Sequence, residues 1–157
     1  MNDLTVSNIE RQNILNNKYA VTKIQEALDF VGIEFEGEYR FTKKMVADFF
    51  EVEERTIERY IEQYSKELTA NGYFLCKGKK LKELKLQFAP VINVGSKTTQ
   101  LGLFNFRAFL NLGMLIAESE KAKQLRSVIL DIVIATINEK TGGGTKYINR
   151  RDVNYIP

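Results

Sequence analysis

Residues 46–61, VADFFEVEERTIERYI, constrain the fold most, because their apolar positions fit two short helices better than one long helix. Ala47 is small enough for a second helix to cross close to the first. Val52 places an apolar side chain near the turn between them. The inner face of the second helix carries apolar residues, namely Ile57, Tyr60 and Ile61. This spacing is typical of a helix-turn-helix. The turn position often held by glycine is Glu51, where a left-handed backbone would be slightly strained.

The second helix, predicted over about residues 55–68, would then be a recognition helix that enters a DNA groove. Arginine can form a bidentate pair with guanine, and threonine can contact a phosphate or a thymine methyl group. The candidate DNA contacts in this part of the chain are Thr42, which caps the first helix, Lys43, Lys44, Arg55, Thr56 and Arg59. The alternative is a purely structural helix pair, with glutamate and arginine side chains paired three or four residues apart.

A basic segment follows the predicted recognition helix. Residues 73–76 form a predicted strand after Gly72 ends the helix, residues 77–80 a lysine-rich turn, and residues 81–88 a second strand. A helix-turn-helix followed by a hairpin with a basic tip has the layout of a winged helix, whose wing contacts the phosphate backbone or a minor groove. The expected phosphate contacts are Lys77, Lys79, Lys80 and Lys82. The lone cysteine, Cys76, is interpreted as a small core residue. The alternative is that these lysines form a solvated loop that does not contact nucleic acid.

The apolar spacing and capping residues in the rest of the chain predict helices with short strands between them. Ser7 caps a first helix to about Asn17, and a second covers residues 21–30, with Gly32 ending it. Residues 33–41 alternate as one strand, or as two strands bent at Gly37. The remaining predictions are strands at 91–94 and 100–104, a helix at 106–117 capped by Asn105, and a helix at 120–140 capped by Ser119. The apolar stripe of the last helix is wide, so we expect it to be buried in its own domain or against a second copy.

These elements predict an α+β, mostly helical fold, with a winged helix-turn-helix followed by a small strand-helix-helix unit. The expected segments are an N-terminal helical extension (1–38), the winged helix-turn-helix (39–88), the strand-helix-helix unit (89–140), and a glycine linker with a basic tail (141–157). A chain that ends in this way is interpreted as the front part of a longer protein.

The residue content of the chain argues against several kinds of functional site. The chain has no histidine and one cysteine, which argues against a structural zinc site, an internal disulfide and a histidine-dependent nucleophilic triad. No apolar run reaches the roughly 20 residues of a membrane span, and residues 1–10 lack the pattern of a signal peptide. No glycine-rich loop precedes a helix in phosphate-binding form. We therefore expect a cytoplasmic protein that is not an enzyme, with no catalytic residues, metal or cofactor.

Two motifs together resemble a known family. FTKKMVADFF leading into RTI (residues 41–50 and 55–57) is similar to the start of RhuM-type virulence-associated proteins. LFNFRAFLNLG followed by SEKAKQLR (residues 103–113 and 119–126) is similar to their second half and to Bro-N domains of phage antirepressors. The resemblance covers roughly residues 39–135, while residues 1–38 have no counterpart in it. It implies a prokaryotic or phage DNA-binding module, often joined to a separate C-terminal part.

Two functions from different classes follow. The first is a transcriptional or mobile-element regulator that binds double-stranded DNA, as a homodimer through the 120–140 helix because one short helix reads only a few base pairs. Arg107, Lys121, Lys123 and Arg126 could add phosphate contacts, or could pair with Glu118 and Glu120. The alternative is an antirepressor-type module that captures a repressor protein with the glutamates around the recognition helix.

Overall fold

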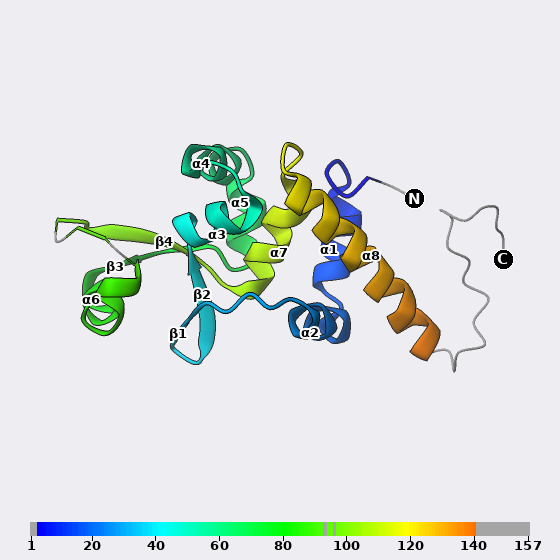
Figure 1. The fold of residues 1–157 in the computed structure, drawn as a ribbon, viewed down its shortest axis with the longest axis horizontal. Coiled ribbons are helices and arrows are strands. Elements are labelled where there is room, and N and C mark those ends of the chain that lie inside the picture. Colours follow the sequence, from blue (N-terminus) through cyan, green and yellow to red (C-terminus); the bar gives the residue numbers. More distant parts are fainter. Residues whose placement is uncertain (1–2, 93, 96, 141–157) are drawn as a thin grey trace. The chain divides into compact units, whose positions relative to one another are not determined.

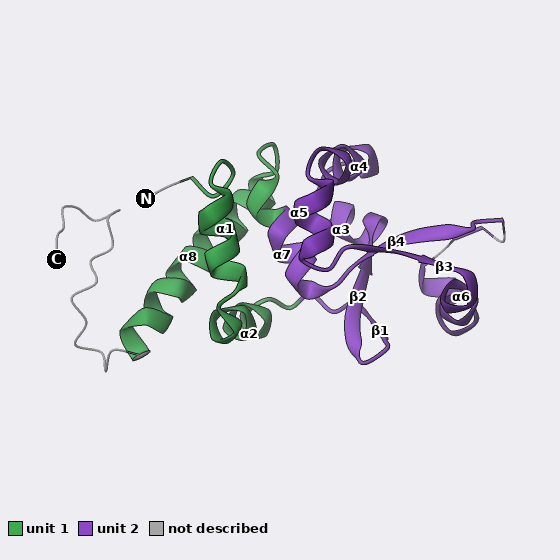
Figure 2. Cartoon of the chain, turned by 180° about the vertical axis from the view of Figure 1, so that it is seen from behind, with its two compact units in different colours: residues 1–29, 113–157 green, residues 30–112 purple. Residues whose placement is uncertain are grey.

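The computed structural model describes residues 3–92, 94–95 and 97–140 of the chain. The predicted glycine linker and basic tail, residues 141–157, lie outside the described residues. The chain divides into two compact units, one made of residues 1–29 and 113–157 and the other of residues 30–112 (Figure 2). The fold is α+β and mostly helical, with a small antiparallel sheet in the second unit, which confirms the predicted class.

The first unit is helical. Its complete helices are α1 (Asn8–Leu15), α2 (Lys18–Ala27) and α8 (Glu120–Lys140). The predicted caps at Ser7 and Ser119 are confirmed, because their hydroxyls accept hydrogen bonds from the backbone N–H groups of Glu10 and Ala122. The second helix begins earlier than predicted, because Asn17 caps it. It also ends earlier, at an extended Leu28, so Gly32 does not end it.

Polar contacts at the helix ends hold this unit together. The Arg126 guanidinium donates hydrogen bonds of 2.9 and 2.7 Å to the carbonyls of Gly113 and Ile116. It thereby satisfies carbonyl groups at the end of the preceding helix. α8 packs against α2, and the Tyr19 hydroxyl donates a 2.6 Å hydrogen bond to Glu139 of α8. That hydrogen bond to a carboxylate raises the pKa of Tyr19.

The second unit is built around a four-stranded antiparallel sheet in the order β1-β2-β4-β3 (Figure 1). Its elements in chain order are β1 (Ile33–Phe35), β2 (Glu38–Thr42), α3 (Lys43–Phe50), α4 (Glu54–Gln63), α5 (Ser65–Ala70), β3 (Phe74–Lys77), α6 (Gly78–Ile92), β4 (Gln100–Phe104) and α7 (Phe106–Leu115), whose last residues belong to the first unit. The bend at Gly37 is confirmed. Glu36 and Gly37 both have positive φ, 56° and 81°, as a two-residue hairpin turn between β1 and β2 requires.

The predicted break within residues 46–61 is present. Thr42 caps α3 by accepting a hydrogen bond from the Met45 N–H. α3 ends at Glu51, which takes the left-handed conformation (φ 58°, ψ 45°) that glycine adopts more easily. α4 begins three residues later and buries Ile57 and Tyr60. The predicted single helix over 55–68 is wrong in one detail, because the backbone at Tyr64 (φ −116°, ψ 35°) separates α4 from α5.

The predicted hairpin over residues 73–88 is wrong. Residues 78–92 form α6, and the strand that pairs with β3 is β4, with Leu75 opposite Gly102 and Lys77 opposite Gln100. The cause is the position of the apolar side chains. Leu81 and Leu84 recur at helical spacing and are buried against the sheet, whereas Leu86, the residue that made the pattern alternate, is 86% exposed. The strand predicted at 91–94 is wrong at its start, because α6 reaches Ile92 after a break in the helical backbone at Phe88 (φ −132°, ψ 16°).

Two apolar clusters hold the second unit. Five phenylalanine rings pack against one another in stacked, tilted and edge-to-face pairs, with centroid separations of 4.5–5.6 Å. They come from the loop before β1, from β2, from α3 and from α7, and are Phe30, Phe41, Phe49, Phe50 and Phe109. The other cluster lies between α6 and the sheet and includes Cys76, Leu81, Leu84 and Leu103. Met45 of α3 packs against this second cluster too, so α3 and α6 share part of their packing on the sheet.

Cys76 is expected to resist alkylation in the native protein. Its side chain lies in the cluster under α6 and is 1% exposed, which confirms the prediction of a core residue. Burial raises the pKa of its thiol, which lowers the fraction of reactive thiolate at neutral pH. Iodoacetamide labelling followed by mass spectrometry should be at least about tenfold slower in buffer than in urea. Equal rates in both solvents would contradict this placement of Cys76.

Candidate nucleic-acid interface

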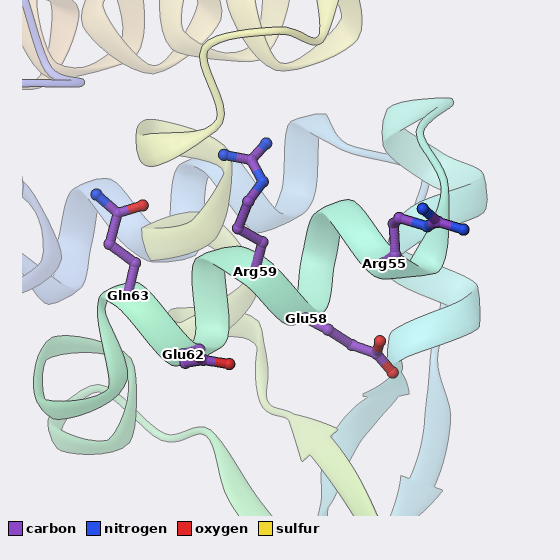
Figure 3. A pocket seen from close by; sticks show the side chains of 5 residues that line it. All are labelled: Arg55, Glu58, Arg59, Glu62 and Gln63. Carbon is purple, nitrogen blue, oxygen red and sulfur yellow. The ribbon is translucent and has the colours of Figure 1, made fainter.

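A row of polar side chains covers the outward face of α4. The exposed positions recur in adjacent pairs four residues apart, as Glu54 and Arg55, Glu58 and Arg59, and Glu62 and Gln63. Ile57 and Tyr60 face inward between them. Five of these residues line a shallow depression of about 470 Å³, namely Arg55, Glu58, Arg59, Glu62 and Gln63. Figure 3 shows Arg59 and Gln63 projecting to one side of α4 and Glu58 to the other. We call the six exposed residues the α4 row.

The chemistry of the α4 row matches the edges of bases in a major groove. Guanidinium groups donate to guanine O6 and N7, a glutamine amide pairs with adenine N6 and N7, and a carboxylate accepts from cytosine N4. The row contains all three types of group, in Arg55 and Arg59, in Gln63, and in the glutamates. The Arg59 guanidinium also lies 4.9 Å from the centroid of the Tyr60 ring, which favours a defined direction for this long side chain.

The predicted contacts on α3 are engaged within the protein. Thr42 is 4% exposed, and its hydroxyl caps the helix. The Lys43 ammonium lies 3.1 Å from a carboxylate oxygen of Glu58 and so joins α3 to the middle of α4. Lys44 pairs with Asp48 on its own helix at 3.3 Å. An exposed ion pair of this kind contributes little to stability. The Lys43 pair does, however, neutralise one of the glutamates of the α4 row.

The four predicted wing lysines fall on two different surfaces. Phe74 and Cys76 of β3 pack toward α6. Because side chains alternate along a strand, Leu75 and Lys77 lie on the opposite face of the sheet. Figures 1 and 2 show α4 and α6 on opposite sides of the ribbon formed by β3 and β4. Lys77 and its neighbour Gln100 are exposed at the far end of this ribbon.

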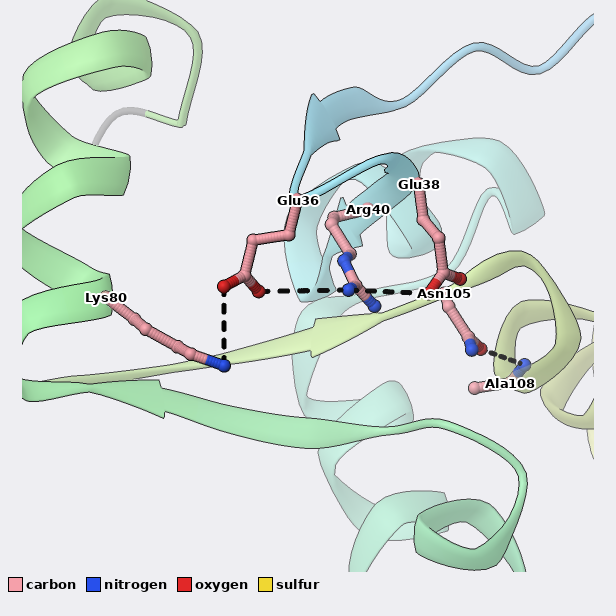
Figure 4. A network of polar contacts seen from close by, with 6 residues as sticks. All are labelled: Glu36, Glu38, Arg40, Lys80, Asn105 and Ala108. Carbon is pink, nitrogen blue, oxygen red and sulfur yellow. Dashed lines mark hydrogen bonds and ion pairs between the residues drawn. The ribbon is translucent and has the colours of Figure 1, made fainter.

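The other three lysines, Lys79, Lys80 and Lys82, belong to α6. Lys80 lies 3.4 Å from a carboxylate oxygen of Glu36, in the turn between β1 and β2 (Figure 4). Glu36 also approaches the guanidinium of Arg40, which lies 5.0 Å from the centroid of the Phe74 ring. Lys80 therefore ties α6 to the β1–β2 hairpin. The structure does not bring these lysines together with Arg55, Thr56 and Arg59.

A buried amide network positions the end of α5 against α7. The Asn71 side chain donates to the side-chain amide oxygen (Oδ1) of Asn111 at 2.7 Å and accepts from the Arg107 guanidinium at 2.9 Å. The Asn111 side chain in turn donates to a Glu67 carboxylate oxygen at 2.7 Å. Asn71 and Asn111 are 2% and 0% exposed, so these bonds satisfy groups that water does not reach. Arg107 and Arg126, considered above as phosphate contacts, thus both bond to groups of the protein.

Sequence reasoning missed three residues of this surface. Glu62, Gln63 and Gln100 were not among the predicted DNA contacts. The signal for Gln63 was available, because it lies four and eight residues after Arg59 and Arg55 on one helix. Gln100 could not be found in the same way, since its place opposite Lys77 depends on the pairing of β3 with β4 across α6.

The described part of the chain holds no group of three or more His, Cys, Asp or Glu side chains that could bind a metal ion. In the same residues, no helix has the length and apolar character needed to cross a membrane. Comparison of the chain with known proteins gives no significant match to a family model, a curated protein or a solved structure.

Proposed function

We propose that the chain is a DNA-binding module in which residues 30–112 form a winged helix-turn-helix with a helix inserted in the wing. The main support for this proposal is the order of the helices and strands around the sheet. β2 precedes the helix pair α3–α4 and pairs with β4, and β3 follows that pair and borders β4 on its other side. In this proposal α4 is the recognition helix, the β3–β4 ribbon is the wing, and α6 occupies the place of the wing tip.

The α4 row supports insertion of this helix in a major groove. Its exposed positions are polar, whereas its apolar residues Ile57 and Tyr60 are buried against the unit. Arg55 and Arg59 would donate to guanines, with discrimination of about 1–3 kcal/mol for each good bidentate pair. The carboxylates need not oppose binding, because Glu58 is neutralised by Lys43 and a glutamate can accept from cytosine. Thr56, half-buried beside Arg55, would have at most a secondary role.

A homodimer through α8 remains part of the proposal. One α4 row spans only a few base pairs, and two copies related by a two-fold axis would read a palindrome. Along α8, Leu125 and Ile129 are buried, but Val128 is 38% exposed and Ile132 and Val133 are half-buried. These side chains are available to a second copy. The resemblance to RhuM-type and Bro-N proteins leads to the same function on separate grounds.

The deciding experiment is selection from a random-sequence duplex pool by the purified chain at two salt concentrations. We expect an enriched motif and retention that falls steeply with salt, because each phosphate contact adds about 0.9 to the slope of log affinity against log salt. A palindromic motif would support the dimer. Absence of retention even at low salt would contradict DNA binding.

Replacement of single lysines should show which side of the β3–β4 ribbon contacts DNA. Lys77→Ala should weaken binding to all sequences alike and lower the salt slope by about 1, because Lys77 lies on the face of the ribbon away from α6. Lys79→Ala removes the same charge from α6 and should leave both quantities unchanged. Fluorescence anisotropy with a selected and a scrambled duplex measures both effects. Equal losses for the two variants would show that the wing is wrongly assigned.

The second candidate function is capture of a repressor protein by α4. The observation that favours it is the acidity of the α4 row, which carries Glu54, Glu58 and Glu62 against Arg55 and Arg59. Three lysines that were predicted to lie on the wing belong to α6 instead, so the surface around α4 is less basic than the sequence suggested. If the duplex selection fails at low salt, this function takes first place, and the partner would present a basic surface.

A further inference from the structure

The solvent-exposed face of α6 carries both lysines and a large apolar side chain. Its inner side packs into the core cluster through Leu81 and Leu84. On its outer side, Lys79, Lys82 and Leu86 follow one another at spacings of three and four residues, so they share one face. Leu86 is 86% exposed. We call these three residues the α6 surface.

The α6 surface has a shallow hollow at its centre. A depression of about 360 Å³ is lined by Lys82, Lys85 and Leu86. The Lys85 ammonium donates a 2.7 Å hydrogen bond to the Thr98 carbonyl, which fixes the aliphatic stem of this lysine as one wall. Lysine stems are apolar below their charged ends. The hollow therefore offers an apolar floor and wall, with the charge of Lys82 at its edge and Lys79 three residues before it on α6.

We propose that the α6 surface is a docking site for an acidic protein segment with an apolar anchor residue. The anchor would pack on Leu86 in the hollow, and carboxylates beside it would pair with Lys79 and Lys82. Charge supports this occupant, since the segment 78–92 carries four lysines and one glutamate. The 86% exposure of Leu86 favours a protein segment as the occupant, because phosphates gain nothing from apolar contact.

This docking site does not depend on the proposed DNA contact. α6 lies on the side of the β3–β4 ribbon opposite α4 (Figures 1 and 2), so a segment bound there leaves the α4 row open. The inference is that the inserted helix gives the module a second, protein-binding side. Duplex binding and segment binding should then occur together in the same molecule.

The test is selection of 16-residue random peptides displayed on phage, with the full chain as target and the double variant Lys82→Ser/Leu86→Ser for counter-selection. We expect a common motif with one or two large apolar residues flanked by Asp or Glu. The consensus peptide, synthesised with a fluorescent label, is then titrated with each variant. Leu86→Ser should weaken binding about tenfold or more, and Lys82→Ser roughly two- to fivefold.

Leu75→Ser is the matched control, because Leu75 is another exposed leucine (48%) but lies on the sheet face away from α6. Its peptide affinity should equal that of the unchanged chain. Circular dichroism and a melting curve of every variant exclude loss of folding as the cause. No acidic motif, or a consensus peptide that Leu86→Ser binds unchanged, overturns the proposal. Self-association abolished by Leu86→Ser, or Leu86-dependent binding to anionic vesicles without peptide binding, would assign the surface to a different occupant and overturns it too.

Discussion

Gly72→Ala should destabilise the protein by about 3–4 kcal/mol, the largest effect that we expect from a single methyl group. Gly72 follows α5 with φ 121°, a backbone conformation that side chains rarely adopt and whose strain costs about 1–3 kcal/mol. A Cβ atom there would collide with the Asn105 side chain. The Asn105 side chain cannot move away freely, because its amide oxygen (Oδ1) accepts the 2.8 Å hydrogen bond from the Ala108 N–H that caps α7, a contact worth about 1 kcal/mol.

Gly37→Ala is the control for this prediction. Gly37 also has positive φ (81°), but a Cβ atom at this position would meet no heavy atom within 4 Å. Its replacement should therefore cost only backbone strain, about 1 kcal/mol. Urea unfolding followed by circular dichroism measures both variants. Equal losses would show that the contact between residue 72 and Asn105 has no part in the effect.

Four helix starts were predictable because their signals are local. Ser7, Thr42, Asn105 and Ser119 each precede a helix, and each accepts the N–H group three residues ahead, as capping residues do. The break at Glu51 was predicted from apolar spacing alone, without a glycine to mark it. In these cases the residues that decide the structure are neighbours in the sequence.

The pairing of β3 with β4 could not be predicted from local pattern. Leu84, Leu86 and Phe88 alternate as in a strand, whereas Leu81, Leu84 and Phe88 recur as in a helix. Only the sheet decides between the two patterns, because β4, more than twenty residues later, takes the edge of β3 that a second hairpin strand would occupy. The same distant pairing places Lys77 on one side of the ribbon and the lysines of α6 on the other. The positions of the exposed side chains were therefore predictable on α4 and not on the ribbon.

Arg55→Ala/Arg59→Ala should reduce affinity for a selected duplex by roughly 30-fold or more. This follows if each guanidinium contributes the 1–3 kcal/mol expected of a bidentate contact with guanine. Both arginines are exposed in the α4 row, on successive turns of one helix, and both line the depression shown in Figure 3. Anisotropy titrations with the selected duplex and with a duplex changed only at its guanines measure the loss and the discrimination.

Two matched variants separate base reading from charge in this experiment. Lys79→Ala/Lys82→Ala removes the same two positive charges from α6, and we expect it to keep both affinity and discrimination. Arg55→Lys/Arg59→Lys keeps the charge of α4 but cannot form the planar two-bond contact with guanine. It should retain much of the affinity for any sequence and lose preference for the selected one. If the lysine variant discriminates as well as the unchanged chain, α4 contacts phosphates and the bases are read by another part of the protein.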